Sequence, residues 1–261
     1  EDYEVAQTRK RIFIIGSRED CPKADYPDAH YDVGFIGNGE ESRSIGVKEA
    51  ISDLEEVEIH RRGDGEVDPN RLDYSGYRKH FDVKKNGSFE LCHNRSGMKG
   101  PIFNHIGSDH QEKSIKRFAA TEPGETEEIS RFHKLHPEEP SNTLRAGTAR
   151  NRGAFTAARP IHYSKPRCIS VREAARIHSF PDWFRLNRTI WHGFRQVGNS
   201  VVPFLGKKIA ERIRTNLDVE VNDLPVYDLP KPDEGLLQMS MSKACEYFGV
   251  PEELVEKRDT K

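Results

Sequence analysis

The sequence predicts an α/β fold in which helices and a buried strand flank an irregular middle region. The run Ile12–Gly16 is β-branched, too short for a helix and apolar on both faces, which is typical of a buried strand. Residues 170–179 carry a clear helix start, because Ser170 can cap and Glu173 stands three residues later as its capping-box partner. Residues 203–216 begin with proline and carry one apolar stripe, which indicates a second helix.

Weaker signals complete the outline of the chain. Helical spacing also predicts helices over 47–54, 109–121 and 126–133 and a helix–turn–helix-like piece over 240–257. The pair Pro123-Gly124 separates two of them, and prolines between 225 and 232 indicate a stiff linker. Residues 60–100 are polar and dotted with glycine, so only brief strands are expected there, near 81–83 and 88–91.

The composition excludes several classes of protein. Of the 261 residues, 34% are apolar and 32% charged, and the mean hydropathy is −0.80, which indicates a large polar surface around a modest core. No stretch approaches the roughly 18 consecutive apolar residues of a membrane span, and the acidic start EDYEVAQ is unlike a secretory signal. Four separated cysteines without a CxxC pair indicate a reduced, cytoplasmic protein with neither a disulfide framework nor a zinc cluster.

Positive charge is segregated along the chain, although the formal net charge is only −2. Between Thr143 and Arg176, seven arginines and Lys165 stand against one acid, Glu173, which gives 8 − 1 = +7. Residues 9–11 form a second cluster of basic side chains. This distribution fits an electrostatic footprint for phosphates, and on charge alone a solvated surface with incidental arginines fits equally well.

Three segments carry the strongest motif signal. They are QTRKRIFIIG at 7–16, RCISVREAARIHSFPD at 167–182 and QVGNSVVP at 196–203. In order and wording they resemble the last motifs of the DNA (cytosine-5) methyltransferase family, over about residues 5–213. Weaker echoes are GVKEAISDL at 46–54, Asn104-His105 and PSNTLRAG at 140–147.

The resemblance implies the C-terminal part of a Rossmann-like methyltransferase domain, of α/β class, with an inserted, small and irregular α+β target recognition domain. The implied divisions are the end of the catalytic domain at 1–60, the target recognition domain at 61–160, helices returning to the catalytic domain at 161–217, and a linker with a helical tail at 218–261. Arg172 and Glu173 are expected to pair or cap and so to organise the recognition region. Two positions depart from the family's wording, Ala6 in place of proline and His178 in place of glutamine.

The motifs of the family's N-terminal half are not found in the chain. The Gly-rich S-adenosylmethionine loop, the Pro-Cys nucleophile and the Glu-Asn-Val motif are missing, and no Cys follows a Pro. The loop GFIGNGEE at 34–41 follows turn-like residues rather than a strand, which favours a flexible loop over a cofactor cradle. We therefore expect the chain alone to be inactive and to need an N-terminal methyltransferase half, upstream in the same chain or as a separate subunit. Glu1 in place of Met favours truncation over a separate subunit or a decayed remnant.

The resemblance implies methyl transfer from S-adenosylmethionine to C5 of a cytosine that is flipped out of double-stranded DNA. Arg11 would stabilise charge at the base O2, because guanidinium is permanently charged and its donors suit a carbonyl, and Arg9 would support that site or bind a phosphate. Asn199 and Ser200 would contact the cofactor. The simpler alternative for Arg9 and Arg11 is an exposed cluster of basic side chains, and for Asn199 and Ser200 it is ordinary helix capping. Residues of the recognition region would contact DNA, namely Thr143, Arg145, Arg150 and Arg152.

Two other functions stay open. A non-catalytic, sequence-specific DNA-binding subunit or remnant would bind DNA with a steep salt dependence but gain no activity from an N-terminal partner. A metal nuclease would use His93-Asn94 with His105 and His110, which lack the spacing of paired ligands, so no metal site is expected. The tail at 240–257 either recognises DNA or packs on the domain.

Overall fold

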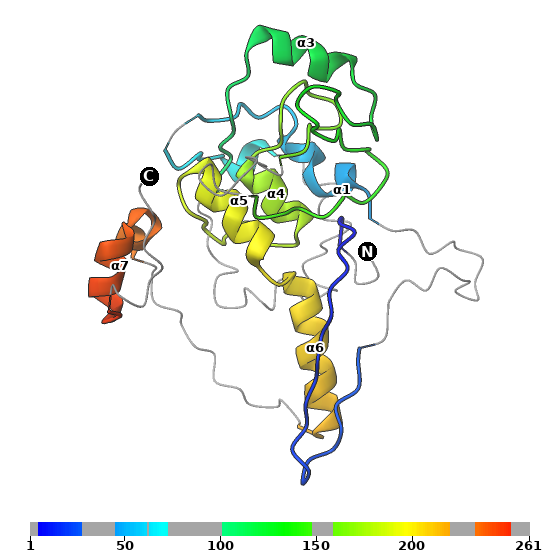
Figure 1. Ribbon diagram of the computed structural model, residues 1–261, viewed down its shortest axis with the longest axis vertical. Coiled ribbons are helices and arrows are strands. Elements are labelled where there is room, and N and C mark those ends of the chain that lie inside the picture. The colour runs from blue at the N-terminus through cyan, green and yellow to red at the C-terminus, as the bar shows by residue number, and fades with distance from the viewer. Residues whose placement is uncertain are drawn as a thin grey trace, which may run out of the picture.

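The computed structural model describes residues 5–27, 45–61, 63–72, 101–147, 159–219 and 233–251. Helices supply most of the regular structure in these ranges (Figure 1). The α-helices are α1 (Val47–Ile51), α3 (Glu112–Ala120), α4 (Val171–Ile177), α5 (Ile190–Asn199), α6 (Pro203–Asn216) and α7 (Met241–Phe248). Short 3-10 helices are η1 (Ser52–Leu54), η2 (Pro69–Arg71) and η4 (Glu234–Gln238).

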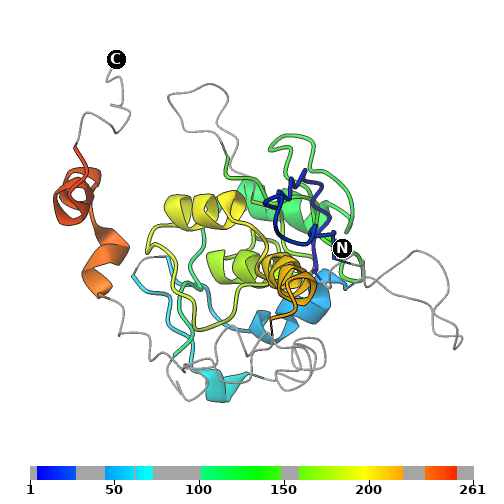
Figure 2. The same ribbon diagram turned by 90° about the horizontal axis from the view of Figure 1, so that it is seen from below.

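Helix α4 is the centre of the core. All of its residues are buried, and α1 packs on one side of it and α5 on the other, as Figure 1 and Figure 2 both show. The Ser170 hydroxyl accepts from the Glu173 amide (3.0 Å) and the Glu173 carboxylate accepts from the Ser170 amide (2.7 Å), which confirms the capping box. Ala174 and Ala175 are fully buried, and such small side chains let neighbouring helices approach closely.

Most of the helix predictions in the described ranges are confirmed. The helices expected over 47–54, 109–121, 170–179 and 203–216 are α1 with η1, α3, α4 and α6. Helix α6 begins at Pro203 and ends at Asn216, as its proline and apolar stripe indicate. Of the tail piece over 240–257, α7 is present, and Gly249 ends it in the left-handed conformation.

The expected buried strand at Ile12–Gly16 is wrong for the described structure. Ile12 is 91% exposed and Ile14 is 92% exposed. The backbone pairing of this part of the chain with other described segments is at its beginning, where the Thr8 amide donates to the Ser141 carbonyl (2.8 Å) and the Ser141 amide donates to the Ala6 carbonyl (2.9 Å). A strand is stabilised by its neighbours, and the described residues offer Ile12–Gly16 no partner strand. The β part of the α/β expectation is therefore limited there to isolated bridges.

The helix expected over 126–133 is also wrong. Thr126 and His133 instead form an antiparallel bridge around a tight turn. The Glu127 carboxylate accepts from the amides of Ile129 (3.2 Å) and Ser130 (2.5 Å). Because a side chain takes these amides and Arg131 has a φ of 60°, the local backbone cannot continue as a helix.

Several expectations lie outside the described residues. These are the loop at 34–41, the brief strands near 81–83 and 88–91, the proline linker at 225–232 and the end of the tail after 251. Within the described ranges, no helix is both long and apolar enough to cross a membrane.

Candidate functional site

Arg9 joins the first motif segment to the PSNTLRAG segment and to the QVGNSVVP turn. Its guanidinium donates to the carbonyl of Leu144 (3.0 Å) and to the carbonyl of Gly198 (2.9 Å), and it lies 3.5 Å from the carbonyl of Ser200. Burial, and then the neighbouring charge of Arg11, lower the pKa of Arg9. The side chain therefore holds the PSNTLRAG segment and the QVGNSVVP turn to the first motif, across 135 and 189 residues of chain.

Gly198 allows the end of α5 to lie directly on the PSNTLRAG segment. A Cβ at this position would stand 2.3 Å from the nitrogen of Ala146 and 2.4 Å from the carbonyl carbon of Arg145. No side chain fits there, because both neighbours are backbone atoms. The Thr143 hydroxyl donates to the Thr8 carbonyl (2.7 Å), which fixes the other side of the same segment.

His178 connects the first motif to the turn after α5. The side-chain amide of Gln7 donates to Nδ1 of His178 (3.1 Å), so Nε2 carries the proton and donates to the Ser200 carbonyl (3.3 Å). Burial first, and then the charge of Arg9, lower the pKa of His178 to about 4. The ring is therefore neutral near pH 7, with one nitrogen accepting and the other donating.

The turn at 198–200 ends α5 and does not begin a helix. Asn199 is the last residue of α5 and is exposed, and Ser200 follows as the C-terminal cap. The Ser200 hydroxyl donates to the Val197 carbonyl (2.7 Å), while Val202 precedes α6. Of the two residues expected to contact the cofactor, Asn199 thus presents its side chain to solvent, and Ser200 shapes the turn.

The arginines with expected DNA or base contacts lie at the surface where they are described. Arg11 is exposed and donates to the Lys10 carbonyl (2.6 Å). Arg145 is exposed and makes no ion pair with a described residue. Arg150 and Arg152 lie outside the described residues. The structure brings Thr143 and Arg145 to Arg9 and Gly198, and does not bring Arg11 into a pocket formed by described residues.

The charged side chains of α4 are structural, as expected for Arg172 and Glu173. Arg167 approaches Glu173 with two nitrogens, at 2.9 and 2.8 Å. Burial would raise the pKa of Glu173, but Arg167 and the neighbouring His162 outweigh it and hold the pKa well below its usual range. Arg172 donates to the carbonyls of Phe103 (2.7 Å) and Phe184 (2.7 Å). These bonds tie the loops on either side of α4 to the helix.

Arg176 lies between two carboxylates in the core. Its side chain is fully buried, donates to Asp53 at 2.5 Å and binds Asp182 with two nitrogens at 2.8 and 2.7 Å. Asp53 belongs to η1 and Asp182 follows α4, so the three charges join two segments of the core. A buried cation between two carboxylates is costly to break, because a carboxylate left alone would remain desolvated.

Asn104 and His105, which are weak echoes of the family's wording, also support the fold. Asn104 adopts a φ of 72°, and its side-chain NH₂ group donates to the carbonyls of Leu186 (3.0 Å) and Asn187 (3.2 Å). Nδ1 of His105 lies 3.0 Å from the Ser170 hydroxyl. Among the described residues there is no group of three or more His, Cys, Asp or Glu side chains that could hold a metal ion, and His93-Asn94 lie outside them.

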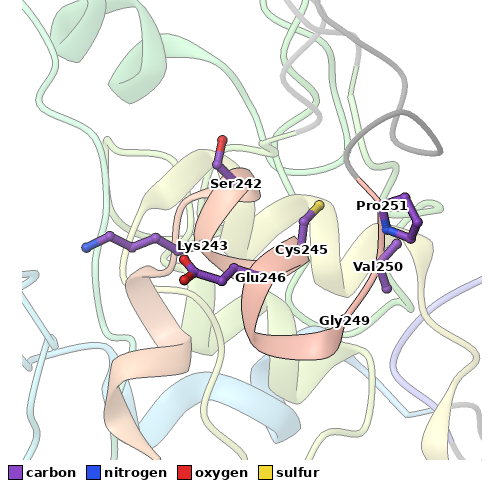
Figure 3. A pocket seen from close by; sticks show the side chains of 7 residues that line it. All are labelled: Ser242, Lys243, Cys245, Glu246, Gly249, Val250 and Pro251. Carbon is purple, nitrogen blue, oxygen red and sulfur yellow. The ribbon is translucent and has the colours of Figure 1, made fainter.

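An open hollow of about 490 Å³ lies on α7, apart from the motif segments. Figure 3 shows Cys245 turned toward Val250 and Pro251 and Lys243 extending away from them. The hollow is lined by residues of α7 and the turn after it, and no motif residue contributes to it.

Sequence reasoning misses α5, whose end packs on the PSNTLRAG segment. A signal for it is present, because Thr189 caps the helix by accepting from the His192 amide (3.3 Å). Phe194 and Val197 are buried on one side, while His192 and Arg195 are exposed on the other. The glycines within the segment hide this amphipathic pattern.

The family model for C-5 cytosine-specific DNA methylases matches residues 1–215. The chain is 38% identical over 257 residues to the type II methyltransferase M.XorII of Xanthomonas oryzae pv. oryzae, covering 98% of this chain and 58% of that protein. It is 28% identical to M.DdeI of Desulfomicrobium norvegicum, covering 81% of this chain and 52% of that protein. The chain thus spans little more than half the length of these curated relatives.

A solved chain encoded in a prophage (E. coli) and assigned as a DNA modification methyltransferase is 30% identical. It aligns with 69% of this chain and 49% of its own length at a TM-score of 0.49. The motif segments that the structure joins at Arg9 all lie within the residues that the family model matches. The chain therefore belongs to the C-5 cytosine-specific DNA methylase family.

Proposed function

We propose that the chain takes part in methylating C5 of cytosine in double-stranded DNA, as the target-recognition and cofactor-side portion of a type II methyltransferase. The observation that carries the proposal is the junction at Arg9, which joins the first motif, the PSNTLRAG segment and the QVGNSVVP turn. A base held near the first motif would thus lie close to both the segment that contacts DNA and the turn that contacts the cofactor.

Arg11 is the residue proposed to act on the reacting base. Its guanidinium would donate to O2 of a flipped cytosine and stabilise the charge that develops in the ring. The donors of Arg9 are taken by the carbonyls of Leu144 and Gly198. Arg9 therefore supports this site by fixing the backbone around it.

The cofactor contact is assigned to the turn after α5. S-adenosylmethionine, when bound, supplies the methyl group. Asn199 fits such a contact because its carboxamide is exposed, whereas the Ser200 hydroxyl is already bonded to the Val197 carbonyl. We therefore assign Asn199 to the ligand and Ser200 to the shape of the turn.

DNA recognition is assigned to the segment that begins at Thr143. Arg145 is exposed beside the end of α5, and Arg150 and Arg152 follow along the same basic stretch. Arginines of this kind suit guanine edges in the major groove and backbone phosphates.

The nucleophile is proposed to come from outside this sequence, because no Cys follows a Pro in it. The test is a chimaera that joins this chain to the part of M.XorII outside the matched region. Labelled S-adenosylmethionine and duplex DNA are supplied, and transfer is measured. The chimaera is expected to methylate DNA, the 261-residue chain alone is not, and transfer by the chain alone would contradict the proposal.

A variant pair makes the test specific to the site. Arg11→Ala in the chimaera is expected to slow transfer by about 10²–10³-fold while leaving DNA affinity nearly unchanged, as for loss of a donor to a developing charge. Arg18→Ala is the matched control, since Arg18 is exposed and pairs with the neighbouring Asp20. If the chimaera binds DNA and S-adenosylmethionine but transfers nothing, the chain is instead a non-catalytic DNA-binding subunit or remnant.

A further inference from the structure

The outer face of α5 carries a polar stripe, of which the assigned sites use only Asn199, at its end. His192, Arg195, Gln196 and Asn199 are all exposed and follow one another at helical spacing. The opposite face is buried in the core and consists of Gly193, Phe194, Val197 and Gly198. Helix α5 contains no acidic residue, so the stripe is neutral to positive throughout.

Arg195 is the charge that stands out on this stripe. From Trp183 to Ala210 the sequence holds five bases and no acid. Four of the five bases contact carboxylates elsewhere in the described chain, namely Arg185, Arg188, Lys207 and Lys208. Arg195 makes no ion pair with any described residue, so its charge is available to a ligand.

The stripe lies beside the segment assigned to DNA recognition. The contact at Gly198 places the backbone of Arg145 and Ala146 directly against α5. Arg195 precedes Gly198 by three residues, which is about 60° round the helix and about 4.5 Å along its axis. Both arginines are exposed, and Arg195 lies on a side of α5 that adjoins the face in contact with this segment.

We propose that the outer face of α5 binds the phosphate backbone of duplex DNA, with Arg195 as its charged contact and Gln196 as a neutral donor. Gln196 can donate because its side-chain oxygen already accepts from the Asn187 amide (2.8 Å), which leaves its NH₂ group for a ligand. A duplex presents one negative charge about every 1.7 Å of its axis, so an unpaired arginine in a region free of acids is complementary to it. Such contacts fix the register of the protein on DNA without reading the bases. The inference rests on the proposed function, because it takes the same duplex as its ligand.

The test is the affinity of the 261-residue chain for short fluorescent duplexes of different sequence, measured by anisotropy at several salt concentrations. Arg195→Ala is expected to weaken binding about threefold to tenfold at about 50 mM salt, equally for every sequence. The slope of log affinity against log salt should fall by about 0.9, so the deficit shrinks about threefold at about 200 mM. Arg195→Lys should restore most of the affinity, because it keeps the charge.

The control is Lys113→Ala, which removes one exposed charge from α3, at the top of Figure 1. It should leave the affinity unchanged, and an equal loss from Lys113→Ala would overturn the assignment to α5. Wild-type affinity and salt slope in Arg195→Ala would overturn it as well. If the wild-type chain binds duplexes, either of these results leaves the proposed function standing. A wild-type chain that binds no duplex contradicts the proposed function and the assignment to α5.

Discussion

Replacing Gly198 by Ala perturbs the tightest contact of the site. The added Cβ would stand 2.3 Å from the Ala146 nitrogen, where ordinary contact begins at 3.4 Å, so the two segments must separate by 3.4 − 2.3 = 1.1 Å. Neither neighbour can rotate away, because both are backbone atoms. Overpacking of this kind costs about 1–3 kcal/mol, and we expect about 3 kcal/mol here because no flexible side chain can yield.

The matched control is Gly206→Ala in α6, where a Cβ would meet nothing within 4 Å. In this helix interior alanine should stabilise by about 0.5–1 kcal/mol, since glycine loses more backbone freedom on folding. Urea unfolding followed by circular dichroism measures both free energies, and duplex affinity measures the displacement of the recognition segment. Gly198→Ala should lower both quantities. A Gly198→Ala protein as stable as wild type, or shifted in the same direction as Gly206→Ala, would refute the close-packing argument.

Three further substitutions test the core and its titrating groups, each by urea unfolding. Arg176→Met leaves the buried Asp53 carboxylate without its cation and should cost about 3–5 kcal/mol. Lys116→Met, in an exposed ion pair, should change stability by less than about 0.5 kcal/mol, and equal effects would contradict the burial argument. The pKa of His178 is lowered from 6.5 to about 4, so the unfolded chain takes up its proton first and stability falls as pH drops from 6.5 to about 4. His178→Gln should remove that part of the pH slope, and an unchanged slope would count against a neutral ring. The pKa of Glu173 is lowered, so its contribution is complete above about pH 4.5 and is lost as pH falls further; Glu173→Gln should be less stable at pH 7 and show a flatter acid limb.

Local signals in the sequence predict the helices well. The capping box at Ser170 and Glu173 and the proline at 203 each act within one helical turn, and the structure places α4 and α6 at those positions. The failures are of two kinds. The run Ile12–Gly16 has strand-like residues, but a strand also needs neighbours, which composition does not supply. At 126–133 the carboxylate of Glu127 takes backbone amides and so favours a turn.

The site is predicted in parts but not as an assembly. The motif wording indicates Arg9, Asn199 and the PSNTLRAG segment separately, whereas the bonds from Arg9 to Leu144 and Gly198 depend on the tertiary fold. The structural role of Gly198 becomes visible only when the facing backbone is known. His178 shows the same limit, because its difference from glutamine has no meaning until both of its ring nitrogens are seen to have partners.

We propose that this chain belongs to the machinery that methylates C5 of cytosine. The most direct measurement is mass spectrometry of nucleosides from duplex DNA after incubation with S-adenosylmethionine and the chimaera of this chain with M.XorII. We predict 5-methylcytosine, strongly reduced by Arg11→Ala and unchanged by Arg18→Ala. A methyl group on an exocyclic amine, or none in a folded chimaera that binds DNA and S-adenosylmethionine, would contradict the account.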